Sequence, residues 1–239
     1  MSDVTEEPLT GGGMNAVARV GDTVRRPVGP WTPNVHRLLD LLAPLGLSPV
    51  VRGFDGQGRE VLSYLEGEVG HPPIPPGLRG DDTLVALARV VRALHDASVP
   101  LVGLREGWRF PPVEPVEVIC HNDLAPYNVV FRDGVPKGVI DFDTARPGPR
   151  WWDVAYTAYC LVPFSPEFGT VPEQRRRAAL FCAAYGITAD DLPHRVLLRL
   201  DDMVRMIREQ PEFARQREER HDEYYLRHAG YVRAHFLDH

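Results

Sequence analysis

Apolar and polar residues alternate near the start of the chain, over residues 15–26, and Gly21-Asp22 interrupts the alternation. A Gly-Asp pair between two alternating runs is typical of a β-hairpin. A second pair of such runs, over residues 50–65, predicts another hairpin. Between them, residues 32–46 repeat their apolar positions at helical spacing. We therefore expect a small antiparallel sheet with one helix.

The pattern changes after a proline-rich connection at residues 71–80. An amphipathic helix is predicted over residues 81–97, and strands and turns over residues 116–143. Four further helices are predicted over residues 151–162, 172–185, 189–209 and 212–236. This order predicts an α+β protein of two lobes, with a nucleotide-binding lobe over residues 1–66 and a mainly helical lobe over residues 67–239.

Composition narrows the class of protein. The 239 residues are 44% hydrophobic and 25% charged, as in an ordinary globular protein. The net charge of -6 argues against nucleic acid as a partner, and no apolar run approaches the ~20 residues of a membrane span. The acidic start lacks a signal-peptide pattern, and three scattered cysteines suit a reducing compartment. We expect a cytoplasmic protein.

Residues 118–153 carry the candidate chemistry. A hairpin folded about residues 132–137 would place Asn128 and Asp141 side by side at its open end, with Asp123 on the loop that leads into it. An amide oxygen and two carboxylates would then converge. Such hard oxygen ligands suit Mg²⁺, which binds one or two carboxylates together with substrate phosphates and water.

The spacing of these residues matches a phosphoryl-transfer template. In protein kinases, a loop of the form His-Arg-Asp-x-x-x-x-Asn precedes Asp-Phe-Gly, whose aspartate binds the metal. Here His121-Asn122-Asp123 leads to Asn128 at the same interval, and Asp141-Phe142-Asp143 stands where Asp-Phe-Gly would. A single Asp or Asn beside a strand is usually a turn former. The complete set favours phosphoryl transfer instead.

Residues 119–155 resemble the aminoglycoside phosphotransferase and choline kinase family, which is related to protein kinases. The resemblance rests on the catalytic-loop motif, on Ile140-Asp141-Phe142 and on Trp152-Asp153-Val154-Ala155. It implies a bilobal protein-kinase-like fold that binds ATP or GTP between its lobes and, with Mg²⁺, phosphorylates a hydroxyl of a small molecule.

The resemblance also implies roles for single residues. Asp123 would accept the proton of the substrate hydroxyl. Asn128 and Asp141 would hold Mg²⁺. Asp143 replaces the glycine of Asp-Phe-Gly, where it would either assist a second metal ion or cap the turn.

Two further residues would support this loop. His121 would orient the loop rather than take part in the chemistry. Asp153, at the start of a helix, would accept hydrogen bonds that lock the loop, a role compatible with stabilisation by the helix dipole.

The small lobe matches the family less closely. Gly13, in a run of three glycines, would close over phosphates, although such a run is equally typical of a flexible loop. The strand that normally presents a lysine to the phosphates carries Arg26, because the only lysine of the chain is Lys137. Arginine binds phosphate well but with a different geometry.

Two other features of this lobe bear on nucleotide binding. The helix that would offer a glutamate to Arg26 has only His36, Arg37 and Asp40, so the usual ion pair is not expected from it. The segment around Ser63 and Leu65 resembles the family's hinge, where the Ser63 carbonyl and the Leu65 N–H would bind the base; alternatively, it is an ordinary edge strand.

The sequence does not identify the molecule that accepts the phosphate. The candidates are an aminoglycoside-like compound, an amino alcohol, and another metabolite or antibiotic. An acidic cluster at residues 218–223 is interleaved with arginines, which favours a solvated helix face over a substrate site. A catalytically weak or inactive nucleotide-binding module is the alternative function, because the usual lysine and helix glutamate are missing. Phosphorylation of a protein is disfavoured by the absence of an Ala-Pro-Glu segment after Asp141.

Overall fold

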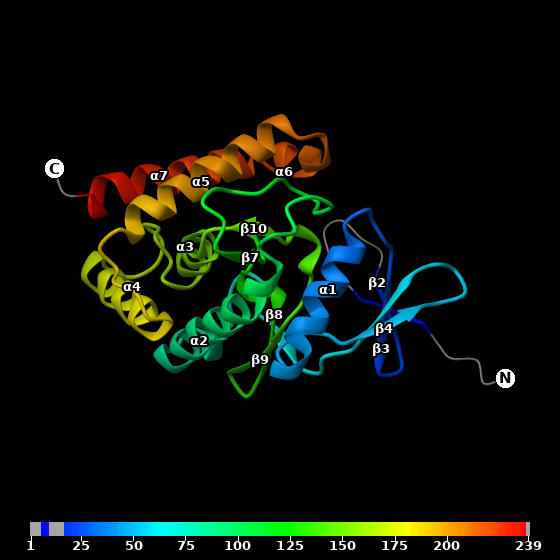
Figure 1. Ribbon diagram of the computed structural model, residues 1–239. Helices are drawn as coiled ribbons and strands as arrows, with labels where there is room; N and C mark the ends of the chain where they lie inside the picture. Colours follow the sequence, from blue (N-terminus) through cyan, green and yellow to red (C-terminus); the bar gives the residue numbers. More distant parts are fainter. Residues whose placement is uncertain (1–5, 10–16, 238–239) are drawn as a thin grey trace.

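The first part of the chain forms a five-stranded antiparallel sheet (Figure 1). The computed structural model describes residues 6–9 and 17–237. The strand order is β1-β2-β3-β5-β4. The strands are β1 (Glu7–Leu9), β2 (Val17–Val20), β3 (Thr23–Arg26), β4 (Val51–Phe54) and β5 (Glu60–Ser63). Both predicted hairpins are present, β2–β3 and β4–β5, and β3 and β5 join them in a register that pairs Arg26 with Glu60.

One helix, α1 (Thr32–Leu42), accompanies this sheet, as predicted. Pro33 lies in its first turn, where a missing N–H costs nothing. A short 3₁₀ turn follows, and Gly46 ends it with a φ of 65°, which glycine adopts without strain. The buried face of α1 carries Val35, Leu38, Leu39 and Leu42, and it packs between the sheet and the second part of the chain.

The rest of the chain is mainly helical (Figure 1). Its helices are α2 (Asp81–Ser98), α3 (Arg150–Leu161), α4 (Val171–Tyr185), α5 (Leu192–Glu209), α6 (Ala214–Glu218) and α7 (His221–Phe236). Helices α5 and α7 lie side by side along one edge, and α2 packs against α4. These features confirm the predicted α+β fold class.

Short strands are embedded among the helices. They are β6 (Glu68–Val69), β7 (Val118–Cys120), β8 (Val129–Arg132), β9 (Val135–Val139) and β10 (Arg146–Gly148). They form one sheet of order β6-β8-β9 and the pair β7-β10. Strand β6 follows the first sheet directly but pairs with β8 of the second part. The predicted lobe boundary at residue 66 remains a prediction.

The prediction of one continuous helix over residues 212–236 is wrong. The structure has a 3₁₀ turn at Pro211–Phe213, then α6, and then α7. The break falls at Arg220, which has a left-handed φ of 57°. The chain reverses here so that α7 can return along α5 and bury Val232 and Phe236. No glycine or proline lies between residues 212 and 229, so the sequence does not mark the break at Arg220.

A continuous hydrophobic core links the helices. Leu87 and Val91 of α2, Ala155 of α3 and Phe181 of α4 are all completely buried in it. Among residues 6–9 and 17–237, no helix combines the length and the apolar character that crossing a bilayer requires.

Leu87→Ala should destabilise the protein by about 2–5 kcal/mol, because it leaves a cavity at a fully buried position of α2. Leu198→Ala is the matched control, since Leu198 is 51% exposed on α5, and it should change stability by less than about 1 kcal/mol. Urea unfolding followed by circular dichroism measures both values. Equal losses for the two variants would contradict the assigned core.

Candidate active site

The loop between β7 and β8 brings the predicted catalytic residues together. A 3₁₀ turn at Pro126–Asn128 leads into β8, and the Ile140 N–H donates to the Asn128 carbonyl at 2.9 Å. This bond holds Asn128 beside the end of β9, where Asp141 follows. The Asn128 amide donates to the Asp123 carboxylate at 3.0 Å. Asp123, Asn128 and Asp141 all line one cleft.

Backbone strain marks both ends of this arrangement. Asn122 has a φ of 70° and Asp141 a φ of 64°, in the left-handed region that is sparsely populated by residues other than glycine. Asn and Asp tolerate it best. The hydrogen bonds around them hold these conformations, which is typical of functional sites.

Arg26 lies at the centre of an ionic cluster that joins the two parts of the chain. Its side chain is 8% exposed. Its guanidinium contacts Asp141 Oδ1 at 3.1 Å, Asp143 Oδ2 at 2.5 Å and Glu60 Oε1 at 3.0 Å. Charge-assisted contacts to buried carboxylates, such as those of Glu60 and Asp143, are stronger than contacts at a surface.

The acidic partner of Arg26 comes from an unexpected element. No glutamate was expected from α1, and none is there; instead Glu60 of β5, paired with Arg26 across the sheet, supplies the carboxylate. His36 of α1 binds the second oxygen of Glu60, with Nε2 2.7 Å from Oε2. Burial raises the pKa of the Glu60 carboxyl, while Arg26 and His36 oppose that shift. The helix is thus connected to Arg26 through Glu60.

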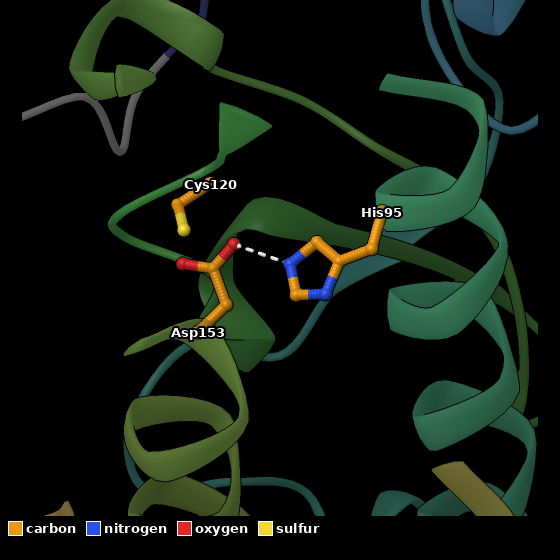
Figure 2. A group of neighbouring side chains, drawn as sticks. All are labelled: His95, Cys120 and Asp153. Atoms are coloured by element: carbon orange, nitrogen blue, oxygen red, sulfur yellow. Dashed lines mark hydrogen bonds and ion pairs between the residues drawn. The ribbon is translucent and has the colours of Figure 1, made fainter. Parts of the chain in front are cut away.

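A buried carboxylate anchors the loop that carries Asp123. Asp153, in the first turn of α3, accepts from the backbone N–H of His121 at 2.6 Å and from that of Asn122 at 2.8 Å. His95 of α2 lies with Nε2 3.1 Å from the same carboxylate (Figure 2). Burial alone would raise the pKa of Asp153, but these hydrogen bonds outweigh it and hold the pKa below its usual range. The predicted anchoring contacts are therefore present.

His95, Cys120 and Asp153 lie close enough to suggest a metal site, with ligand atoms within 4.8 Å of one another (Figure 2). Their chemistry does not fit one. The Asp153 oxygens already accept three hydrogen bonds. Burial raises the pKa of the Cys120 thiol well above its usual range, whereas a metal-binding cysteine must lose its proton. We interpret the group as a structural hydrogen-bond network.

His121 orients the loop from the other side. Its Nε2 lies 2.9 Å from the Ile140 carbonyl, which can only accept, so Nε2 carries the proton. The carboxyl group of Asp123 is buried, and this burial raises its pKa. A hydrogen bond from the Tyr127 hydroxyl, at 2.6 Å, opposes the shift.

The residues predicted to hold Mg²⁺ fit that ion in chemistry. Asn128 uses its amide NH₂ on Asp123, which leaves its amide oxygen as the ligand atom. Asp141 is half-exposed and faces the cleft together with Asp143. Carboxylate and amide oxygens are what Mg²⁺ prefers. Both carboxylates also contact Arg26, so a bound cation would share them with the guanidinium.

The cleft has a volume of about 1320 Å³ and receives residues from both parts of the chain. Val24, Ser63 and Leu65 line it on the sheet side, where the hinge was predicted. Gly13, predicted to close over phosphates, lies outside the described residues.

Sequence reasoning missed three residues that support this site: Glu60, His95 and Arg199. Arg199 is 1% exposed, and its Nη2 donates to the Asn122 carbonyl at 2.6 Å. A signal existed for it, since Arg199 falls on the apolar side of α5, three residues after Val196. Glu60 was detectable from the pairing of its strand with that of Arg26, but His95 looked like any other residue of an amphipathic helix.

The comparison with known proteins agrees with the geometry. Residues 104–198 match the model of the phosphotransferase enzyme family. The match confirms the predicted resemblance to this family. It covers the catalytic loop, the Asp141 segment and the Asp153 anchor of the phosphotransferase pattern.

Individual proteins are similar over different parts of the chain. The trifolitoxin immunity protein of Rhizobium leguminosarum bv. trifolii is 38% identical over 148 residues, which is 58% of this chain and 55% of that protein. The chain therefore spans about half of that relative. A choline/ethanolamine kinase family protein from Mesorhizobium loti is 18% identical with a TM-score of 0.57, covering 98% of this chain and 94% of that one.

An aminoglycoside phosphotransferase solved with GDP and kanamycin has the same fold. It is 18% identical, with a TM-score of 0.62, and the alignment covers 99% of this chain and 95% of that one. Together with the observed small sheet and helical second part, these neighbours confirm the protein-kinase-like fold.

Asp153→Asn should lower the free energy of unfolding by about 2–4 kcal/mol at pH 7, because an amide cannot accept all the hydrogen bonds of the buried carboxylate. The folded-state pKa of Asp153 is depressed. Its carboxylate therefore stabilises the fold above the unfolded pKa of about 3.9, and this stabilisation is lost as the pH falls through the folded-state value.

The difference between wild type and Asp153→Asn should consequently be largest near neutral pH and shrink in acid. Urea unfolding at several pH values measures it. Asp201→Asn, at a half-exposed position of α5, is the control and should cost less than about 1 kcal/mol. A difference that does not depend on pH would contradict an ionised Asp153.

Proposed function

We propose that this protein is a kinase that transfers the γ-phosphate of ATP or GTP to a hydroxyl of a small molecule. The observation that carries the proposal is the convergence of Asp123, Asn128 and Asp141 in one cleft with Arg26 opposite them. The family match over residues 104–198 supports the same reaction class.

Each residue has a defined task in this reaction. Asp123 orients the acceptor hydroxyl and receives its proton as the acceptor oxygen bonds to the γ-phosphorus. The bond from the γ-phosphorus to the bridging oxygen breaks, and the nucleoside diphosphate leaves with that oxygen. Because this transition state is loose, positioning contributes more than basicity. Asp153 keeps the Asp123 loop in place from below.

The nucleotide would lie against the sheet, with its base near Ser63 and Leu65 and its phosphates near Arg26. Asn128, Asp141 and Asp143 would hold Mg²⁺, which when bound offsets the charge of the phosphates. Arginine suits this position because its planar fork contacts two oxygens at once. Glu60 would fix the orientation of that fork.

The alternative function is a catalytically weak nucleotide-binding module. The missing lysine still supports it. The partner that Arg26 finds in Glu60 weakens it, since an ion pair with a buried carboxylate is present despite the changed residue types. Transfer of phosphate, measured directly, distinguishes the two functions.

One relative gives an indication of the chemical class of the phosphate acceptor. The 38% identical relative is named an immunity protein against trifolitoxin. This supports an antimicrobial compound, rather than a central metabolite, as the molecule that the protein acts on.

Asp123→Asn should lower kcat by about 10²–10⁴-fold while leaving nucleotide affinity unchanged, because only the proton acceptor is lost. Asp133→Asn in the β8–β9 turn is the matched control, since asparagine tolerates its left-handed φ of 54°. Radiolabelled phosphate transfer and calorimetric nucleotide binding measure the two quantities. Full turnover in Asp123→Asn would refute the assigned role.

Glu60→Gln should raise the KM for nucleotide about tenfold or more and change kcat less, because the loss of one charge-assisted contact leaves Arg26 poorly oriented toward phosphate. Glu68→Gln, at an exposed position of β6, should leave both constants as they are. If the two variants behave alike, Glu60 does not position Arg26.

A further inference from the structure

The part of the cleft next to Asp123 is lined by tyrosines from three elements. We call them the tyrosine wall. Its members are Tyr127 of the 3₁₀ turn, Tyr156 and Tyr159 of α3, and Tyr224 and Tyr225 of α7. The wall begins at the reacting carboxylate, because the Tyr127 hydroxyl donates to Asp123 Oδ1 at 2.6 Å.

The wall is continuous from that point outward. The hydroxyl oxygens of Tyr127 and Tyr156 are 3.1 Å apart, and the rings of Tyr156 and Tyr159 stack with centroids 6.3 Å apart. Tyr225 lies 6.1 Å from Tyr159 and 5.7 Å from Tyr224, again between ring centroids. Met203, Met206 and Ile207 of α5 also line the cleft. A molecule that reaches Asp123 along this route meets tyrosine side chains and adaptable methionines.

Three carboxylates at the border of the cleft already form ion pairs. They lie outside the catalytic cluster and are Glu167, Glu173 and Glu219. Each has an arginine partner: Arg227 at 3.3 Å, Arg176 at 2.7 Å and Arg215 at 2.8 Å, respectively. A polycationic acceptor would have to compete with these arginines for the carboxylates outside the catalytic cluster.

One polar group stands at the outer end of the wall. His228 is 2% exposed and lines the cleft. Its Nδ1 lies 2.7 Å from the Tyr159 hydroxyl, but its buried Nε2 has no hydrogen-bond partner among the described residues. The nearest carboxylate oxygen, of Glu167, is 3.6 Å away. A buried polar atom without a hydrogen bond is costly, so a ligand group that pairs with it would be favoured.

We propose that the acceptor is a hydroxyl compound of little or no charge, with a flat aromatic or apolar body that packs on the tyrosine wall and a carbonyl that accepts a hydrogen bond from His228. The proposal rests on the proposed kinase function and names its substrate class. The phosphoryl group passes to the acceptor oxygen and the hydroxyl proton to Asp123, as described above.

Direct binding tests this substrate class independently of turnover. Calorimetry at 150 mM salt, with Mg²⁺ and with or without a non-hydrolysable nucleotide analogue, compares N-acetyl-tyrosinamide with kanamycin. The neutral aromatic probe should bind at least about tenfold more tightly. Tighter binding of kanamycin would overturn the proposal.

Tyr225→Ala should weaken binding of N-acetyl-tyrosinamide about tenfold and leave nucleotide affinity unchanged. Leu226→Ala, at the neighbouring position of α7 and 39% exposed, is the control and should change neither affinity. His228→Ala should weaken N-acetyl-tyrosinamide but not 4-ethylphenol, which keeps the aromatic hydroxyl and lacks the carbonyl. Unchanged affinities in Tyr225→Ala, or equal losses for the two probes in His228→Ala, would contradict the proposed contacts.

The same measurements separate this inference from the proposed function. Binding of the neutral probe with the expected variant effects, but without Mg²⁺-dependent nucleotide binding or phosphate transfer, would leave the subsite standing and remove the kinase assignment. Phosphate transfer to kanamycin in preference to neutral hydroxyl compounds would support the kinase assignment and overturn the proposed substrate class.

Discussion

The geometry of the candidate active site depends on one buried carboxylate. Asp153 accepts from two consecutive backbone N–H groups of the loop that carries Asp123, and these bonds help to hold Asn122 in its left-handed conformation. Arg199 and Trp152 add hydrogen bonds to the Asn122 carbonyl and side chain, so the shape of the loop is fixed from several elements. Because Asp153 belongs to α3 and touches His95 of α2, the loop is fixed relative to the largest part of the core. The contacts of Asp123 with Tyr127 and Asn128 form within this anchored loop.

The two halves of the proposed reaction use different elements. The nucleotide side combines the sheet with the β8–β9 hairpin, whereas the acceptor side is built from α3, α5 and α7. Only the loop around Asp123 belongs to both. Apart from Tyr127, which donates to Asp123, the residues of the tyrosine wall lie on α3 and α7, away from the residues proposed to hold phosphate. Tyr224 and Tyr225 of the tyrosine wall lie outside residues 104–198, the segment that the phosphotransferase family model matches.

The sequence predicted the fold well where periodicity and turn residues agreed, as in the β2–β3 hairpin and α1. It also predicted that Asp123 and Asn128 would meet, because only a short 3₁₀ turn separates them and it brings the Asn128 amide back to the Asp123 carboxylate. It failed at residue 220, where the reversal depends on packing between α5 and α7 rather than on a turn residue.

The supporting residues of the site were harder to predict, for a physical reason. Glu60, His95 and Arg199 act across contacts between elements that are far apart in the chain. Periodicity identifies a buried face but does not say which loop that face will touch. The substitution of Glu60 for a helix glutamate follows only from the register of β3 and β5.

The position of Arg26 between Glu60, Asp141 and Asp143 has a consequence for the protein before it meets any ligand. Three clustered carboxylates would repel one another in a poorly hydrated cleft. The guanidinium acts as an internal counter-ion and relieves that repulsion. The repulsion is thus relieved within the chain itself, and the divalent cation of the proposed reaction would enter a pocket whose carboxylates are already held in place.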